Sequence, residues 1–211
     1  MIPTKPLIIS EAGMWKWGPT KETKTGAANN AWDRENPWAY GVFMAEYAIQ
    51  SIEVGTWSVL AWMLDDNSHH GFNWGMWTSK ADGMKLRPWF YTWSLLTGAF
   101  PAGSKFQKVY SPPVYANLRI LAAKLPDATK APNADNNAWS ILIVNNGEKH
   151  SRIRVRVPGV TAQQTAVYTY ARQAARVDAD GFPVPVATTT INLDDGFPMS
   201  FPPQSVTIIM P

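Results

Sequence analysis

The first hundred residues alternate between short apolar runs and segments with helical periodicity. Residues 6–11 form an apolar run that ends in polar residues and Gly13, and residues 56–64 form a second run that is apolar almost throughout. Such runs predict strands buried on both faces, as in a parallel sheet. A long loop and a helix are expected after each run, and the order strand, helix, strand, helix is typical of an α/β domain.

Both helices carry recognisable terminal signals. The first is predicted to begin at Pro37 with Asn36 as its N-cap, and Gly55 suits a left-handed C-terminal cap. The second is expected over residues 87–97, with Gly98 after its end. The apolar residues of the first helix recur every three or four positions and so share one face: Trp38, Val42, Ala45, Ile49 and Ile52.

After residue 101 the pattern changes to short strand-like runs separated by turns. Ile153, Val155 and Val157 alternate with arginines, which is the period of a half-exposed strand. Asn146-Gly147 lies between two runs and predicts a hairpin. The pattern predicts an antiparallel β-sandwich of about six to eight strands. The runs cover residues 106–110, 114–125, 139–144, 151–157, 165–170, 188–193 and 205–210.

Composition and charge exclude several classes of protein. Of the 211 residues, 45% are hydrophobic and 17% charged, which permits a packed core and argues against a disordered chain. The formal charge is +3, but the basic residues are scattered, so we expect no nucleic-acid partner. Arg152, Arg154 and Arg156 are expected to form a solvated strand face, with an acidic-polysaccharide site as the alternative. The absence of cysteine excludes disulfides and thiol chemistry.

The sequence carries no membrane or export signal that we can identify. No stretch of 18 apolar residues exists, so we expect no membrane span. Residues 1–10 lack the pattern of a signal peptide. The location of the protein therefore stays unknown. The natural amino terminus can lie upstream of Met1, so the lack of a signal peptide here does not exclude export, and we favour an extracellular or periplasmic location.

The tryptophans are concentrated in the first half, where ten of the eleven precede residue 94. Those at helix or strand positions are interpreted as packing residues: Trp38, Trp57, Trp89 and Trp93. Flat indole faces also match the C–H faces of sugar rings, so the loop tryptophans are either sugar contacts or core. These loop residues are Trp15, Trp17, Trp32, Trp74 and Trp77.

The segment of residues 65–70 combines two aspartates with His69 and His70. Both residue types ligate metals, but the spacing fits no common ligand motif. We interpret the segment as a polar loop at the rim of a cleft, in which either His69 or His70 is expected to hydrogen-bond a substrate hydroxyl. No metal and no other cofactor is predicted.

Two strand–helix units cannot close a barrel, because a complete (β/α)8 barrel needs about 250 residues. Residues 1–103 are therefore expected to be a partial barrel segment that belongs to a longer protein or receives neighbours from partner chains. Packing on the sandwich as an irregular α/β layer is a third option. The expected fold class is α/β plus all-β, with residues 104–211 as the sandwich domain.

The motif Ile9-Ser-Glu11-Ala-Gly13 resembles the seventh strand of the clan A retaining barrel glycosidases, in which a strand ends in the nucleophilic Glu. Residues 57–66 resemble strand eight, and Trp62 lies where the clan places a tryptophan beneath the sugar ring. Two further segments resemble the return into helix eight and the end of the clan's carboxy-terminal sandwich. They are Gly75-Met-Trp77 through Arg87-Pro-Trp-Phe-Tyr91, and Phe201-Pro-Pro-Gln-Ser-Val-Thr207.

The resemblance implies part of a retaining O-glycosidase acting on β-linked poly- or oligosaccharides, with Glu11 as nucleophile. The clan's general acid/base follows an Asn about a hundred residues before the nucleophile, and no Asn-Glu pair occurs in the chain. The alternatives are a non-catalytic carbohydrate-binding protein and an assembly module derived from such an enzyme. A purely structural alternative for Glu11 is an exposed strand-end residue or an ion pair with Lys5 or Lys16. The expected partners are carbohydrate and either further copies of the chain or the missing amino-terminal barrel portion.

Overall fold

The computed structural model describes residues 5–13, 37–66, 75–111, 113–126, 138–172 and 176–211. It divides the chain into two compact units, Met1–Phe90 (unit 1) and Tyr91–Pro211 (unit 2). In the described residues the class is mixed α/β with antiparallel sheets and few helices, as expected. The expected domain boundary after residue 103 stays a prediction.

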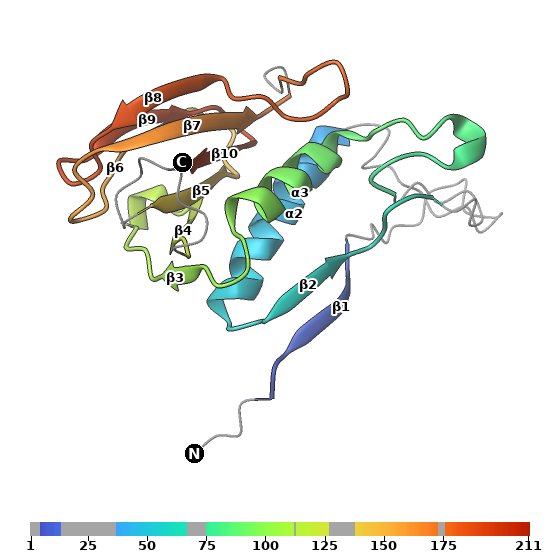
Figure 1. Cartoon of the computed structure of the whole chain (residues 1–211), viewed down its shortest axis with the longest axis horizontal. Helices are drawn as coiled ribbons and strands as arrows, with labels where there is room; N and C mark the ends of the chain where they lie inside the picture. Colours follow the sequence, from blue (N-terminus) through green and yellow to red (C-terminus); the bar gives the residue numbers. More distant parts are fainter. Residues whose placement is uncertain (1–4, 14–36, 67–74, 112, 127–137, 173–175) are drawn as a thin grey trace. The chain divides into compact units, whose positions relative to one another are not determined.

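Unit 1 contains a two-stranded parallel sheet, β1 (Ile8–Ala12) and β2 (Ser58–Ala61), which lie side by side in Figure 1. Ile8 pairs with Ser58 and Ile9 with Val59. Between the two strands in sequence runs the helix α2 (Pro37–Glu53). The predicted strand–helix–strand order and the parallel pairing of its strands are therefore confirmed.

The helix α2 forms where its apolar periodicity and its cap predict it. Val42, Ala45 and Ile49 are at most 2% exposed, so the predicted face is the buried one. Gly55 adopts a φ of 83° and donates its N–H to Ile52 O at 2.9 Å, while Thr56 N–H reaches Ser51 O at 3.0 Å. This pair of bonds is a Schellman motif, which satisfies carbonyls at the helix end.

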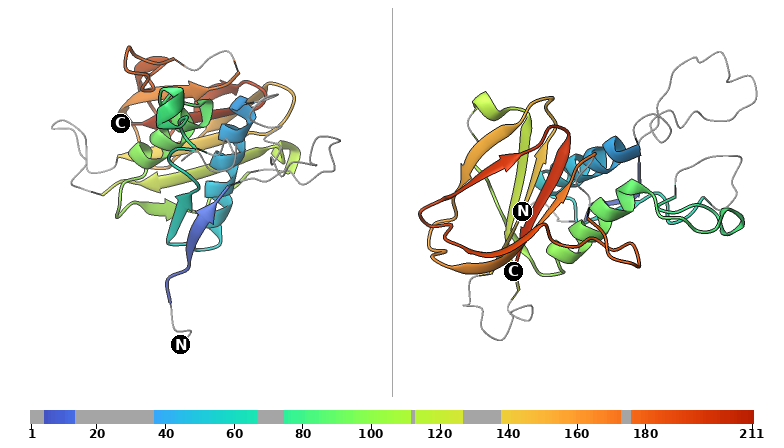
Figure 2. Two further views of the ribbon diagram at one scale, coloured as in Figure 1. Left: turned by 90° about the vertical axis from the view of Figure 1, so that its right-hand side faces the viewer. Right: turned by 90° about the horizontal axis from the view of Figure 1, so that it is seen from above.

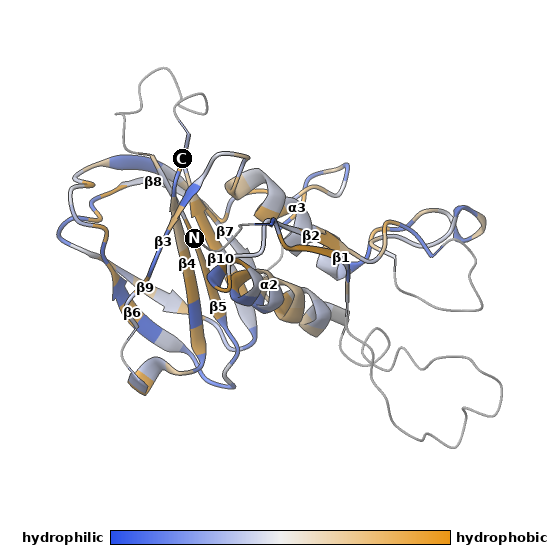
Figure 3. Cartoon of the chain, turned by 90° about the horizontal axis from the view of Figure 1, so that it is seen from below, coloured by the Kyte–Doolittle hydropathy of each residue, from blue (hydrophilic) through white to orange (hydrophobic). Residues whose placement is uncertain are grey.

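The predicted burial of β1 and β2 on both faces is wrong. Ile8 and Leu60 are each 54% exposed, and Leu64, which follows β2, is 62% exposed. Each strand has only the other as a neighbour among the described residues, so one edge of each and much of their apolar surface lack cover. Figure 3 shows this apolar character on both strands.

After β2 the chain passes through the short 3₁₀ helix η2 (Lys80–Asp82) into α3 (Pro88–Ala99). Pro88 begins this helix, as its fixed φ favours. The predicted end before Gly98 is wrong, because Gly98 lies inside the helix. The φ of Gly98 is not positive, so this glycine does not form a left-handed cap of the kind seen at Gly55.

Unit 2 is a β-sandwich of two sheets, which face each other in Figure 2. The larger sheet has the order β3-β4-β5-β10-β7-β8, and the smaller pairs β6 with β9; all of these pairings are antiparallel. The strands are β3 (Lys105–Gln107), β4 (Leu118–Lys124), β5 (Trp139–Asn145), β6 (Ser151–Val155), β7 (Gln163–Tyr170), β8 (Ala187–Ile191), β9 (Phe197–Phe201) and β10 (Ser205–Met210), with a 3₁₀ helix η3 (Pro113–Tyr115) before β4. The predicted antiparallel sandwich is confirmed, and β9 is the strand that the pattern missed.

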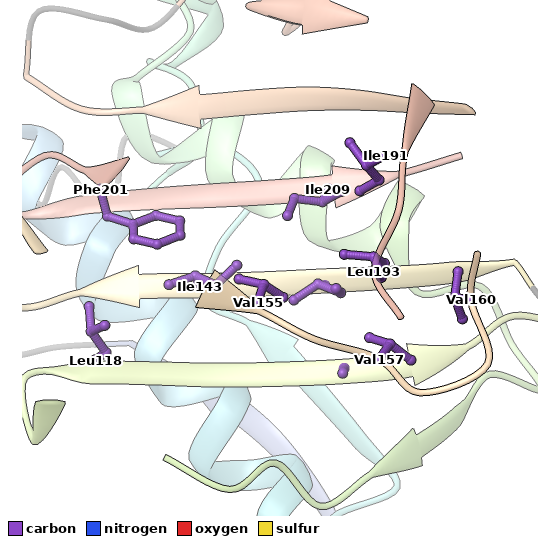
Figure 4. Packing of buried hydrophobic residues seen from close by; sticks show 11 residues of the cluster. Leu118, Ile143, Val155, Val157, Val160, Ile191, Leu193, Phe201 and Ile209 are labelled. Carbon is purple, nitrogen blue, oxygen red and sulfur yellow. The ribbon is translucent and has the colours of Figure 1, made fainter. Parts of the chain in front are cut away.

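The core of the sandwich is an aliphatic cluster between its two sheets (Figure 4). Ile143 and Ile209 come from the larger sheet, while Val155 and Phe201 come from β6 and β9. Tyr170 on β7 is buried as well but is not a member of this cluster. Its burial, with Tyr91 as a second cause, raises the pKa of its hydroxyl. The inward-facing side chains therefore come from both sheets, as a sandwich requires.

The predicted hairpin at Asn146-Gly147 is wrong, because β5 and β6 belong to different sheets. The Asn145 amide nitrogen donates to Lys149 O at 2.9 Å and to Pro202 O at 2.7 Å. Its carbonyl oxygen accepts from Gly147 N–H at 3.1 Å. These side-chain bonds fix a connection that crosses between the sheets.

Candidate active site

Glu11 is the penultimate residue of β1, and its side chain is exposed. The strand brings it to the carboxyl end of the parallel pair, which is where barrel enzymes hold their catalytic groups. Within the described part of the chain the Glu11 carboxylate makes no hydrogen bond or ion pair, so the alternative pairing with Lys5 is not found. Lys16, the other suggested partner, lies outside the described residues.

Trp62 follows the last residue of β2 and reaches the same end of the sheet as Glu11. Its backbone N–H donates to Ala12 O at 2.8 Å, directly beside Glu11 in the sequence. The residue is 39% exposed, so part of the indole is available to a ligand. The parallel register thus brings the carboxylate of Glu11 and the aromatic ring of Trp62 to one end of two adjacent strands.

Gly13 permits a close approach at this end of the sheet. A Cβ at this position would lie 2.9 Å from the Tyr40 hydroxyl and 3.5 Å from Trp62 O, so a side chain would push into the site. Tyr40 comes from α2, and its ring packs edge-on against Trp89 at a centroid distance of 5.2 Å. The sequence pattern missed Tyr40, since it lies outside the apolar stripe of the helix.

After β2 in the sequence, a buried ion pair joins Asp66 to Arg87. Arg87 Nη1 donates to Asp66 Oδ1 at 2.7 Å, and Nη2 donates to Oδ2 at 2.6 Å, a bidentate geometry. The side chains are only 8% (Asp66) and 10% (Arg87) exposed. The interpretation of Asp66 as part of a polar rim is therefore wrong, because its carboxylate is occupied inside unit 1.

Gly75 completes this cluster, which we call the Asp66–Arg87 clamp. Its N–H donates to Asp66 Oδ1 at 2.9 Å, and its carbonyl accepts from Arg87 Nη1 at 2.8 Å and from Trp89 Nε1 at 3.1 Å. A Cβ on Gly75 would lie 2.5 Å from the backbone carbon of Asp65, so only glycine fits. The clamp fixes both described ends of the chain around residues 67–74.

The tryptophans fall into several environments. Trp89 is 2% exposed and packs in the core as predicted, whereas the prediction that Trp57 packs is wrong, because 74% of it is exposed. Trp77 is half-buried and lies edge-on to Phe90 at a centroid distance of 6.4 Å, so its role as a sugar contact stays a prediction. The candidate residues outside the described part of the chain are Trp15, Trp17, Trp32, Trp74 and His69.

Two negative findings apply only to the part of the chain that the structure describes. In those residues no three His, Cys, Asp or Glu side chains gather into a group that could hold a metal ion. None of the described helices is both long enough and apolar enough to span a membrane.

The fold is similar to those of known enzymes, although no family model and no curated protein matches the sequence. The chain is similar in structure to a glycoside hydrolase family 30 subfamily 8 xylanase from Clostridium acetobutylicum, with a TM-score of 0.64 and 15% identity. The match covers 97% of this chain and 42% of the xylanase.

Two further enzymes give the same picture. The catalytic domain of a family 30 xylanase C from Talaromyces cellulolyticus matches with a TM-score of 0.64 and 16% identity, over 99% of this chain and 41% of that one. A family 51 α-L-arabinofuranosidase from Thermotoga petrophila matches with a TM-score of 0.61 and 16% identity, over 97% and 42%. The chain therefore spans about two fifths of the length of these proteins. The predicted resemblance to part of a clan A barrel glycosidase is confirmed for the fold.

Proposed function

We propose that this chain is part of a retaining O-glycoside hydrolase that acts on β-linked poly- or oligosaccharides, with Glu11 as its nucleophile. The observation that carries the proposal is the parallel pairing of β1 with β2, because it brings Glu11 and Trp62 to the same strand ends. Retaining hydrolysis begins when a carboxylate attacks the anomeric carbon, and an exposed carboxylate at this end of a barrel strand suits that step.

The substrate class is supported by the similar folds. Two of the similar structures are described as xylanases and a third as an α-L-arabinofuranosidase. We therefore propose xylose- or arabinose-containing glycans as the first substrates to test. Trp62 would lie beneath the sugar ring, where its apolar face matches the ring's C–H groups.

In this proposal the general acid/base comes from a further polypeptide segment, which we call the barrel complement, because the Asn-Glu pair that the resemblance calls for does not occur in the chain. Retaining enzymes need a second carboxyl about 5–5.5 Å from the nucleophile. Asp66, which also follows β2, is bonded bidentately to Arg87 and so does not suit proton transfer to a leaving group. In this proposal the complement adds parallel strands at the open edges of β1 and β2, and one of those strands carries the acid.

The alternative is a non-catalytic carbohydrate-binding or assembly protein derived from such an enzyme. It is favoured by the same pairing of Asp66 with Arg87, because this pairing leaves the Asp66 carboxylate unsuited to act as an acid beside Glu11. Binding to insoluble polysaccharide without turnover supports this alternative.

Release of nitrophenol from aryl glycosides tests the proposal. The chain as a verified monomer should show negligible turnover, since a missing general acid costs about 10²–10⁴ in rate. With the complement, turnover should appear and fall roughly a thousandfold or more in Glu11→Gln, because the covalent route is lost. Turnover by the monomer, or turnover that Glu11→Gln leaves unchanged, would refute the assigned roles.

The complement can be sought in the coding DNA upstream of the Met1 codon. An open reading frame with an Asn-Glu pair about a hundred residues before Glu11 would supply both the strands and the acid. Size measurement by sedimentation provides the second search, because a complement made of further copies of the chain appears as an oligomer.

A further inference from the structure

A groove of about 430 Å³ opens on unit 2, where β6 and β9 pair. Its lining includes Tyr115, Arg152, Arg154, Pro198, Met199 and Ser200. The volume is within the usual range for small-ligand sites, which is about 300–1,000 Å³. The groove belongs to the sandwich and shares no residue with the Glu11 site.

The charge of this groove is positive. The side chain of Arg152 is exposed, and within the described part of the chain its guanidinium makes no hydrogen bond or ion pair. Arg154 donates from Nη1 to Gly196 O at 2.7 Å, which holds its side chain in place and leaves other N–H groups to donate. No carboxylate is among the residues that line the groove. An anion bound here would therefore meet two guanidinium side chains without a competing negative charge.

The apolar part of the groove is held by the sandwich core. Tyr115 on η3 and Met199 on β9 are both half-buried and pack against the aliphatic cluster between the sheets. A tyrosine fixed in this way presents an aromatic surface at little cost in side-chain entropy. Pro198 is exposed and pairs with Arg154, so it adds apolar surface on the same strand face as the arginines. Tyr115 and Pro198 next to the arginines match a ring with both C–H faces and a carboxylate.

We propose that this groove binds a carboxylate-bearing sugar residue of an acidic polysaccharide, with Arg152 as the principal cation. The guanidinium fork of Arg152 donates two parallel hydrogen bonds to the carboxylate, and Arg154 adds a second positive charge. That the ligand is a glycan rests on the proposed function, whereas the preference for an anion rests on the groove alone. The site would hold an acidic polymer on the sandwich while another stretch of it is cleaved.

Affinity electrophoresis of the full chain tests this site. Native gels contain graded concentrations of polygalacturonate, and parallel gels contain neutral xylan. Polygalacturonate should retard the wild-type chain, and Arg152→Gln should weaken this affinity roughly tenfold, the loss expected for one bidentate charge-assisted contact. Arg152→Lys should be intermediate, because it keeps the charge but loses the fork geometry.

Arg156→Gln is the matched control, because it removes the same charge from the same stretch of chain outside the groove. Its affinity should stay within about twofold of the wild type. Equal losses in Arg152→Gln and Arg156→Gln would overturn the site in favour of diffuse charge attraction. Equal retardation by dextran sulfate would overturn the preference for carboxylates, and no retardation by polygalacturonate would overturn the proposal entirely.

Failure of this site and failure of the proposed function give different results. Glu11→Gln should bind polygalacturonate as the wild type does, since Glu11 lies outside the groove. If the wild-type chain does not bind polygalacturonate but nitrophenol is released as proposed, only the groove is rejected. Retained, Arg152-dependent binding without any turnover, even when the barrel complement is present, rejects only the hydrolase.

Discussion

At the scale of single residues, Asp66 and Arg87 form a buried charged pair in unit 1. Both are buried, and their bidentate contact also anchors Gly75. No local pattern predicts this pair, because the partners are 21 residues apart and Asp66 stands in a run of polar residues. The proposed roles of Glu11 and Trp62 rest on the resemblance to the barrel glycosidases, since periodicity alone leaves both as ordinary strand-end residues.

Removal of one member of the clamp should destabilise the chain strongly. Asp66→Ala leaves the Arg87 guanidinium buried without its partner, which costs about 3–5 kcal/mol in the free energy of unfolding. The double variant Asp66→Ala/Arg87→Met should lose less than Asp66→Ala alone, because no unpaired charge remains. Denaturant unfolding measures both values.

Asp180→Ala is the control for this cycle. Asp180 is exposed in a turn of unit 2, so its loss should change the unfolding free energy by no more than about 0.5 kcal/mol. Equal stabilities for Asp66→Ala and Asp180→Ala would mean that the clamp contributes nothing to the fold.

At the scale of elements, helices were more predictable than strand pairing. The face and the cap of α2 follow from local periodicity and from one glycine, and both were found where expected. The Asn146-Gly147 signal failed because Asn145 bonds to Pro202, a residue 57 positions away. The predicted burial of Trp57 and Leu60 was wrong, because burial depends on neighbouring strands and not only on the apolar run in which a residue lies.

The open strands β1 and β2 should make the isolated chain associate. Among the described residues each strand has an unpaired edge, and such edges together with exposed side chains such as Ile8 and Leu60 favour pairing with other strands. A lysine at either position, in Ile8→Lys or Leu60→Lys, should weaken concentration-dependent association about tenfold or more, because each places a charge in the contact surface. Sedimentation equilibrium measures the association constant.

Val54→Lys provides the comparison for these variants. Val54 is 75% exposed just after α2, so the same substitution there adds the same charge away from the two strands. Its association should match that of the wild type. A similar weakening in all three variants would point to net charge rather than to the strand edges.

At the scale of the whole molecule, the two units differ in how complete they are. The sandwich in unit 2 encloses its own aliphatic core between two sheets. The parallel pair in unit 1 leaves apolar surface open among the described residues, and parallel sheets are normally covered on both faces. The exposed strands of unit 1 could be expected from the sequence, because two strand–helix units are too few to close a barrel. The sequence does not indicate which polypeptide would supply further strands.

Covalent trapping of Glu11 tests the central claim most directly. Activated 2-deoxy-2-fluoro glycosides carry dinitrophenolate, which leaves without protonation, so the nucleophile can react even where the acid is weak or absent. The chain is treated in its monomeric and associated fractions, digested with trypsin, and examined by mass spectrometry. Residues 1–16 contain Glu11 as their single carboxylate side chain, so an adduct on that peptide identifies its position. We expect one glycosyl adduct on residues 1–16 in the associated fraction and none in Glu11→Gln. An adduct on any other peptide, or no adduct in either fraction, would contradict the account.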